Sequence, residues 1–174
     1  RRTERENWFM EDSAAVYMRR QVELPSPVRR ATAFICGLGY YELYINGRKV
    51  GDRVLDPLFT DYDKRVVYAA YDVTDRLAAG SNAVGIVLGN GWYSSPTRDV
   101  FGMHDVNWRT PPKVRLNIVV EYESGAREVI ATDRTWRWGH GEIVYNSVRS
   151  GETIDHTRTV HGWNEVGFRD SLWR

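Results

Sequence analysis

The sequence predicts an all-β protein, an antiparallel β-sandwich with one short helical turn. Three observations support this fold class. About eight to ten short segments alternate apolar and polar residues with the period of two that is typical of half-buried strands. Turn-forming residues separate these segments, and no long stretch has the period of an amphipathic helix. The 174 residues suffice for one domain with a sizeable hydrophobic core.

Strands are predicted over residues 15–24, 30–36 and 65–73, where β-branched and apolar residues dominate. Pro25 and Pro27 end the first of these segments, since proline cannot donate to a strand ladder.

A tight hairpin is the strongest local signal in the chain. Tyr41, Leu43 and Ile45 alternate with more polar residues, and Asn46-Gly47 follows at once. This dipeptide favours a type I′ turn, because both central residues of that turn need a positive φ. Asn46 is therefore interpreted as a turn former.

A single helical turn is predicted after the third segment, with Asp72 or Thr74 capping its free amides. Gly80 is predicted to follow the end of that turn. Residues 82–88 are apolar on both faces, which is typical of a strand in the middle of a sheet. Gly85 within this segment predicts a close approach to the backbone.

The second half continues the β pattern. Residues 113–122 alternate most regularly, Ser124-Gly125 predicts a hairpin turn, and residues 126–131 form the returning strand. The last strands are predicted over residues 142–148 and 151–158.

The chain is divided into a polar lead-in over residues 1–14, a β-sandwich domain over 15–160, and a tail over 161–174. The tail spaces three aromatic residues at five-residue intervals, namely Trp163, Phe168 and Trp173. We expect it to lead into a following domain or to pack back on the sandwich.

Composition excludes several classes of partner. The 24 basic and 23 acidic residues nearly cancel, so the sequence predicts no basic face for nucleic acid. The pairs Arg19-Arg20 and Arg29-Arg30 are interpreted as solvated strand positions rather than a phosphate track. There is no apolar run near 18 residues and no signal peptide in this sequence, so no membrane span is expected and the cellular compartment stays unknown.

Metal and redox chemistry leave few signals. Cys36 is the single cysteine, so no internal disulfide can form, and its apolar neighbours predict a buried small hydrophobic side chain. Zinc is not expected, because the chain contains no CxxC, HExxH or EF-hand pattern. No cofactor is required, but calcium is possible, since loop carboxylates and carbonyls bind it without a fixed spacing. Asp105 and Asn107 are loop candidates for such a site.

The longest irregular stretch, residues 89–112, is the leading candidate for contact with a ligand or a neighbouring domain. It combines aromatic rings with amide and carboxylate groups, which is the chemistry that a pair of sugar hydroxyls requires. The six candidate ligand-binding residues are Asn90, Trp92, Tyr93, Asp105, Asn107 and Trp108.

Several motifs resemble, in order, the N-terminal domain of bacterial α-L-rhamnosidases. They are GLGYYELYINGRKVGDRVLDPLFTDYDKRVVYAAYDVTD at 37–75, LGNGWY at 88–93, WRTPPKV at 108–114, SGETIDHTR at 150–158 and GW at 162–163, with a closing aromatic residue at Trp173. The resemblance covers nearly the whole chain after Ala14, and it implies a jelly-roll-like β-sandwich similar to galactose-binding domains. A weaker likeness, in architecture, runs to the sugar-binding domain of β-galactosidase-type enzymes.

The resemblance also implies a role. In α-L-rhamnosidases the catalytic acid and base lie in a separate (α/α)-barrel domain, and no part of this chain matches that domain. The chain is thus expected to be a non-catalytic accessory domain that assists recognition of rhamnose-containing glycans, with the catalytic domain of the same polypeptide as its partner. The alternative is a structural domain that buttresses the barrel without binding sugar. Some similar modules bind L-rhamnose with the help of calcium.

The carboxylates of this chain give no strong catalytic pattern. Glycoside hydrolysis usually needs two carboxylates about 5 to 9.5 Å apart, one of them with a raised pKa. The candidate pairs are Asp61 with Asp63, Asp99 with Asp105, and Glu152 with Asp155. None lies in a sequence context that would raise a pKa, so no catalytic pair is predicted.

Overall fold

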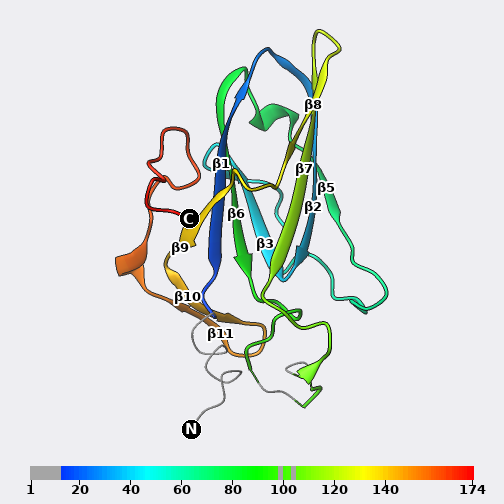
Figure 1. Cartoon of the computed structure of the whole chain (residues 1–174), viewed down its shortest axis with the longest axis vertical. Coiled ribbons are helices and arrows are strands. Elements are labelled where there is room, and N and C mark those ends of the chain that lie inside the picture. Colours follow the sequence, from blue (N-terminus) through cyan, green and yellow to red (C-terminus); the bar gives the residue numbers. More distant parts are fainter. Residues whose placement is uncertain (1–12, 98–99, 103–104) are drawn as a thin grey trace.

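The computed structural model describes residues 13–97, 100–102 and 105–174, and its fold is the antiparallel β-sandwich that the sequence predicts (Figure 1). The strands are β1 (Val16–Leu24), β2 (Val28–Leu38), β3 (Tyr40–Ile45), β4 (Arg48–Lys49), β5 (Ala69–Asp72), β6 (Gly80–Gly89), β7 (Lys113–Tyr122), β8 (Arg127–Ala131), β9 (Arg137–His140), β10 (Ile143–Ser147) and β11 (Gly151–Ile154). Two 3-10 turns are η1 (Thr74–Arg76) and η3 (His156–Arg158). None of the described helices is long and apolar enough to cross a membrane.

Two sheets face each other. Sheet A has the strand order β4-β3-β6-β1-β9, and sheet B has the order β5-β2-β7-β8. Strand β6 therefore lies in the middle of sheet A, as its apolar faces predict. The β10-β11 hairpin forms a small third sheet at one end of the sandwich (Figure 1). The described residues that lead from β6 to β7 lie at the same end.

The core fills the space between the two sheets. Strands β2 and β7 pair with Ala33 opposite Ile118, so their alternate residues point inward together. The fully buried aliphatic side chains of this layer are Ile35, Leu43, Ile45, Val84, Ile86, Leu116, Ile118 and Val120. Their burial is the main force that holds the sheets together, at about 25 cal/mol for each Å² of apolar surface removed from water.

The β3-β4 hairpin confirms the predicted turn, because Asn46 and Gly47 have φ values of 49° and 78°. Asn46 does more than form the turn. Its Oδ1 accepts the Ala83 main-chain N–H at 2.8 Å, and its Nδ2 donates to Asn82 Oδ1 at 2.9 Å and to the Arg76 carbonyl at 2.8 Å. These bonds connect the hairpin to β6 and to η1.

The prediction that Arg19 is solvated is wrong, because its side chain is buried, with 1% exposure. Its guanidinium donates to the Trp163 carbonyl at 2.7 Å and to the Glu165 carbonyl at 3.1 Å, and it forms an ion pair with Asp170. All three partners belong to the tail. The strand pattern could not indicate this burial, because the partners lie about 150 positions away in the sequence.

The tail packs back on the outer face of sheet A, which is one of its two predicted behaviours. Trp163 lies against Gly85, where a Cβ atom would approach its ring to 2.7 Å. The close approach predicted at Gly85 is therefore confirmed. Tyr17 and Tyr44 contact the Trp163 ring edge-on at 5.1 and 5.7 Å, and Trp173 stacks on it at 6.3 Å.

The largest differences between the predicted and the observed boundaries lie at three places. The strand predicted over residues 65–73 begins only at Ala69, since the β5 ladder with β2 starts there. Gly80 does not follow a helix end, because η1 ends at Arg76 and the next residue is extended; Gly80 instead starts β6. The last strand ends at Ile154, where Asp155 accepts the Thr157 N–H at 3.0 Å and begins η3.

Cys36 is half-buried rather than buried. It follows the fully buried Ile35 in β2, so it points to the outer face of sheet B. Its apolar neighbours in the sequence belong to both faces of the strand.

We expect Arg19→Ala to lower the free energy of unfolding by about 2–4 kcal/mol. The substitution leaves two carbonyls without their donor and Asp170 without its partner. Urea denaturation of the chain measures the loss.

Arg20→Ala is the matched control. Arg20 is the next residue of β1, and its side chain is partly exposed and pairs with Asp133 at 3.2 Å. Such a surface pair contributes less than about 1 kcal/mol. Equal losses for the two variants would contradict the proposed role of Arg19 in holding the tail.

Candidate functional site

Asn90 and Asn146 join three segments at the end of the sandwich where β10 and β11 lie. The Asn90 side chain is buried and donates to the carbonyls of Asn146 at 3.0 Å and Ser13 at 3.2 Å. Asn146 Oδ1 accepts the Asn90 main-chain N–H at 2.6 Å, and its Nδ2 donates to the Ser13 carbonyl at 2.8 Å. The predicted site residue Asn90 thus holds the β6–β7 loop against β10 and the residues before β1.

Three rings form what we call the ring cluster: Tyr62, Tyr93 and Trp108. Tyr93 stacks on Trp108 with 5.6 Å between ring centroids, and Tyr62 meets them edge-on at 5.2 and 4.8 Å. Tyr93 is buried and its hydroxyl bonds to Thr110 Oγ1 at 2.9 Å, whereas Trp108 is half-buried. Burial raises the pKa of Tyr62 to about 12. The structure thus brings two predicted site residues, Tyr93 and Trp108, into one packed group.

Trp92 is half-buried and borders the ring cluster through Phe59, at 6.3 Å. The Arg149 guanidinium lies 5.3 Å from the Trp92 ring and 4.8 Å from the Phe101 ring, within the range of a cation–π interaction. Burial raises the pKa of Tyr40, and a hydrogen bond with the Trp92 side chain partly offsets that effect. Trp92 therefore connects the loop aromatics to strand β3.

Asp105 and Asn107 are exposed and precede the half-buried Trp108. Both predicted candidates therefore lie at the surface, close in sequence to an aromatic ring. Asp99 lies outside the described residues, so the predicted pair of Asp99 and Asp105 has no described geometry.

A cleft of about 470 Å³ lies beside this loop, between strands β3 and β6 of sheet A and the β10-β11 hairpin. The residues that line it are Ala15, Tyr40, Tyr41, Glu42, Val54, Leu55, Val87, Gly89, Gly91, Ile143, Asn146, Ser147, Val148, Gly151 and Glu152. Its lining is mostly apolar, with two carboxylates and two phenols. Gly89 and Gly91 connect it directly to the segment that contains Asn90 and Trp92.

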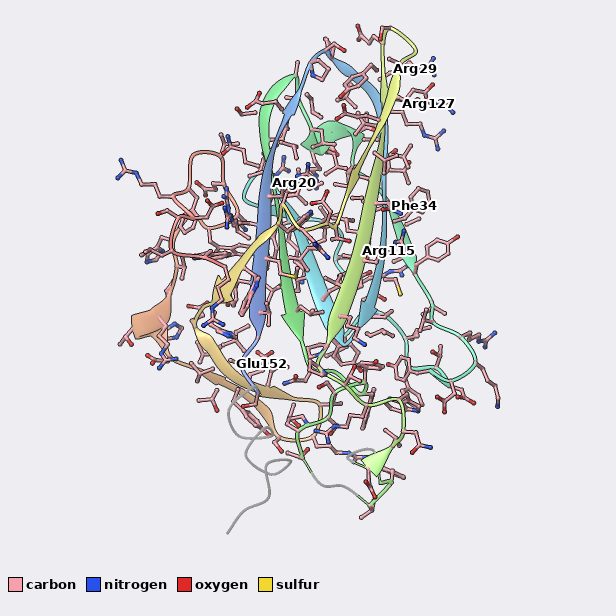
Figure 2. All side chains as sticks on the ribbon, viewed as in Figure 1. Arg20, Arg29, Phe34, Arg115, Arg127 and Glu152 are labelled. Carbon is pink, nitrogen blue, oxygen red and sulfur yellow. The ribbon has the colours of Figure 1, made fainter. Side chains whose placement is uncertain are left out.

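The two carboxylates differ in their surroundings. Glu42 accepts the Tyr44 hydroxyl at 2.5 Å and pairs with Lys49. Glu152 is exposed on β11 at the end of the sandwich (Figure 2), and its carboxylate has no hydrogen bond or ion pair within the described parts of the chain. Glu152 is thus available to accept hydrogen bonds from a bound molecule.

A strained loop forms another wall of the cleft. Leu55 has a φ of 56°, in the left-handed region that side chains other than glycine rarely adopt. Asp56, the next residue, holds this conformation, because its Oδ2 accepts the hydroxyls of Tyr41 and Tyr71, both at 2.8 Å. The Asp56 carbonyl also accepts the Tyr41 main-chain N–H at 3.0 Å. Val54 and Leu55 are thereby presented at the cleft, with 71% and 63% exposure.

No sequence pattern predicted Tyr40, Glu42, Val54 or Leu55 as site residues, and Glu152 was considered only for catalysis. These residues come from separate segments that the fold brings together. One signal was present: Glu42 is a polar residue at an outward position of the predicted hairpin.

The remaining acidic candidates have local roles. Lys64 lies 2.8 Å from Asp61, and its hydrogen bond lowers the pKa of that carboxyl. A hydrogen bond from Thr157 lowers the pKa of Asp155. A general acid needs the opposite shift. Among the described residues, no three His, Cys, Asp or Glu side chains gather as a metal site would require.

Comparison with known proteins gives a consistent result. The model of the α-L-rhamnosidase N-terminal domain family matches residues 26–174. An α-L-rhamnosidase of Formosa agariphila is 40% identical over 163 residues, which is 92% of this chain and 17% of that protein. The chain thus spans about a sixth of the length of such a curated relative.

Solved structures agree with this match. An α-L-rhamnosidase of Streptomyces avermitilis, complexed with L-rhamnose, superposes with a TM-score of 0.87 at 39% identity, over 93% of this chain and 16% of that one. An α-L-rhamnosidase of Aspergillus terreus superposes with a TM-score of 0.86 at 32% identity, over 92% of this chain and 18% of that one.

Tyr62 gives a prediction about pH. In the unfolded chain a tyrosine ionises near pH 10, whereas the folded protein keeps Tyr62 protonated up to about pH 12. The unfolded state therefore releases this proton first, and stability falls as pH rises from 10 to 12. We expect Tyr62→Phe to make this fall less steep, by at most about 1.4 kcal/mol per pH unit, the limit for one proton. Urea midpoints measured across this range test the difference.

Tyr68→Phe is the control, because the Tyr68 side chain is 67% exposed. Its slope is expected to match that of the parent chain. If the stability of Tyr62→Phe fell with pH as steeply as that of the parent chain, this result would contradict the burial of Tyr62 within the ring cluster.

Proposed function

The chain belongs to the α-L-rhamnosidase N-terminal domain family, and we propose that it is a non-catalytic accessory domain of a bacterial α-L-rhamnosidase that assists the recognition of rhamnose-containing glycans. The observation that carries this proposal is the 470 Å³ cleft, where the unpaired carboxylate of Glu152 faces an apolar lining next to the loop aromatics. A cleft that is mostly apolar with a few convergent polar groups is typical of small-molecule sites.

The lining matches the chemistry of a deoxy sugar. L-rhamnose has a methyl group and apolar C–H faces, which suit Val54, Leu55 and Ile143. Its hydroxyls can donate to Glu152, and a hydrogen bond to a charged acceptor is stronger than one between neutral groups.

The residues predicted from the sequence take two proposed roles. Trp92 and Trp108 are half-buried and keep part of their ring surface for contact with a glycan, while Asp105 and Asn107 offer exposed polar groups. Asn90 and Tyr93 are buried, so we propose that they contribute by holding the loop in place.

A second candidate function is structural, and a specific feature favours it. In the loop after β4, Leu58 is 77% exposed and Phe59 is 45% exposed. They follow the exposed Val54 and Leu55 in the same loop. A continuous apolar loop of this kind is suited to pack against another domain. In that case the domain would buttress the catalytic (α/α)-barrel of the same polypeptide and bind no sugar.

A calorimetric titration of the chain with L-rhamnose, first with calcium and then with chelator, separates the two functions. Sugar recognition predicts heat of binding. Heat that disappears with chelator would assign a calcium-dependent site to the exposed loop carboxylates, and heat in both conditions would assign a metal-free site. No heat up to millimolar sugar would reject recognition by this chain and leave the structural role.

We expect Glu152→Gln to weaken L-rhamnose binding by about threefold to tenfold, because a neutral amide is a poorer acceptor than a carboxylate. Glu123→Gln is the matched control. Glu123 is exposed just after β7, at the β7-β8 turn, and it does not line the cleft. Equal affinities for the two variants would remove Glu152 from the proposed site.

Trp92→Ala is expected to weaken binding by a similar factor, since one aromatic contact contributes about 0.5–1.5 kcal/mol. Trp138→Ala is the control, because Trp138 is also half-buried but lies on β9 against Arg174. A loss of affinity in both variants would indicate general destabilisation rather than contact with the sugar.

A further inference from the structure

The outer face of sheet B contains a second, shallower hollow, of about 320 Å³. Its lining residues are Phe34, Cys36, Tyr68, Arg115 and Asn117. Strand pairing explains their arrangement, since Phe34 lies opposite Asn117 and Cys36 opposite Arg115. Three neighbouring segments, β2, β7 and the residues just before β5, therefore form one site.

The positive charge in this hollow has no partner. Arg115 is exposed, and its guanidinium forms no hydrogen bond, ion pair or ring contact within the described residues. Arg29 and Arg127, toward the β7-β8 turn, both pair with Glu121 (Figure 2). Arg115 is thus the arginine of these three whose guanidinium is free to bind an anion, which it can do with two parallel N–H donors.

The wall of the hollow is aromatic. Phe34 and Tyr68 meet edge-on with 6.0 Å between their centroids, and they remain 37% and 67% exposed. Figure 2 shows Phe34 and Arg115 close together on this side of the sandwich. The Asn117 side chain adds an amide that can donate to or accept from a hydroxyl.

We propose that this hollow binds a carboxylate-bearing sugar ring, that is, a uronate unit of a glycan. The carboxylate pairs with Arg115, an apolar face of the ring lies on Phe34 and Tyr68, and a ring hydroxyl bonds to Asn117. A free phosphate would use the guanidinium but not the rings, and a neutral sugar would leave the guanidinium unpaired. The hollow lies on sheet B, away from the cleft lined by β3 and β6, so this proposal does not depend on rhamnose recognition.

Cys36 provides a direct probe of this site, because it lines the hollow and is the single cysteine of the chain. A bound ring should cover it and slow its alkylation by iodoacetamide, followed by mass spectrometry. The reaction is run at about pH 9, since burial raises the pKa of the Cys36 thiol.

D-glucuronate at up to roughly 50 mM, a range suited to a weak site with one charged contact, is expected to slow alkylation by about threefold or more. D-glucose supplies the sugar ring without the carboxylate, and acetate supplies the carboxylate without the ring. Each is expected to slow alkylation by less than about half of the factor expected for glucuronate. An alkylation rate of Cys36 that glucuronate leaves unchanged would overturn the proposal. Equal protection by acetate would indicate a simple anion site, and equal protection by glucose a neutral-sugar site; either result would also overturn it. Protection by an acidic peptide but not by glucuronate would assign the hollow to a protein partner instead.

Arg115→Gln is expected to reduce the affinity for glucuronate by about fivefold, with the alkylation rate of each variant in glucuronate compared with its own rate in the absence of sugar. Arg127→Gln is the matched control, because Arg127 is an exposed arginine on the next strand of the same sheet and does not line the hollow. Phe34→Ala tests the ring contact independently of charge. Full protection in both Arg115→Gln and Phe34→Ala would exclude the proposed binding mode.

Discussion

The mutual hydrogen bonds of two buried asparagines, Asn90 and Asn146, are the constraint on which the β10-β11 end of this domain depends. Each amide satisfies main-chain groups of another segment, and both converge on the Ser13 carbonyl. Inside a protein such a fully satisfied polar network is strong, whereas the loss of one member leaves the others unpaired at a high cost. The network fixes the end of β6 against β10, and this fixes the cleft between them. The exposed groups of the described part of the β6–β7 loop are therefore not needed to hold this end of the fold together.

Much of the sandwich could be predicted because its signals are local. The alternation in residues 113–122 and the Asn46-Gly47 turn depend on neighbours one to four positions away, and the structure confirms both. The burial of Arg19 could not be predicted, since it results from a tail that returns to β1 from the far end of the chain. The half-buried position of Cys36 was also missed, because its apolar neighbours in the sequence, Phe34 and Ile35, lie on opposite faces of β2.

The site was predictable in chemical type and less so in arrangement. The sequence indicated a loop with aromatic and polar residues, and the structure places several of them at one end of the sandwich. The sequence could not indicate that the rings of Tyr93 and Trp108 would stack on each other, because ring stacking depends on how the loop packs. It also could not assemble a cleft whose lining comes from strands β3 and β6, the strained loop at Leu55 and the β10-β11 hairpin.

The cleft beside sheet A and the hollow on sheet B are formed in different ways. On sheet A the tail covers the middle of the outer face through Arg19 and Trp163, and the cleft lies beyond it, beside the β10-β11 hairpin. There the wall is set in advance: Asp56 holds Leu55 in a left-handed conformation without a ligand, so little order remains to be gained on binding. On sheet B no described segment covers Arg115 in the middle of the face, and the strand ladders alone set the side chains. A wall that is held in place before a ligand arrives lowers the ordering cost of binding, which suits the weak sites proposed for this domain.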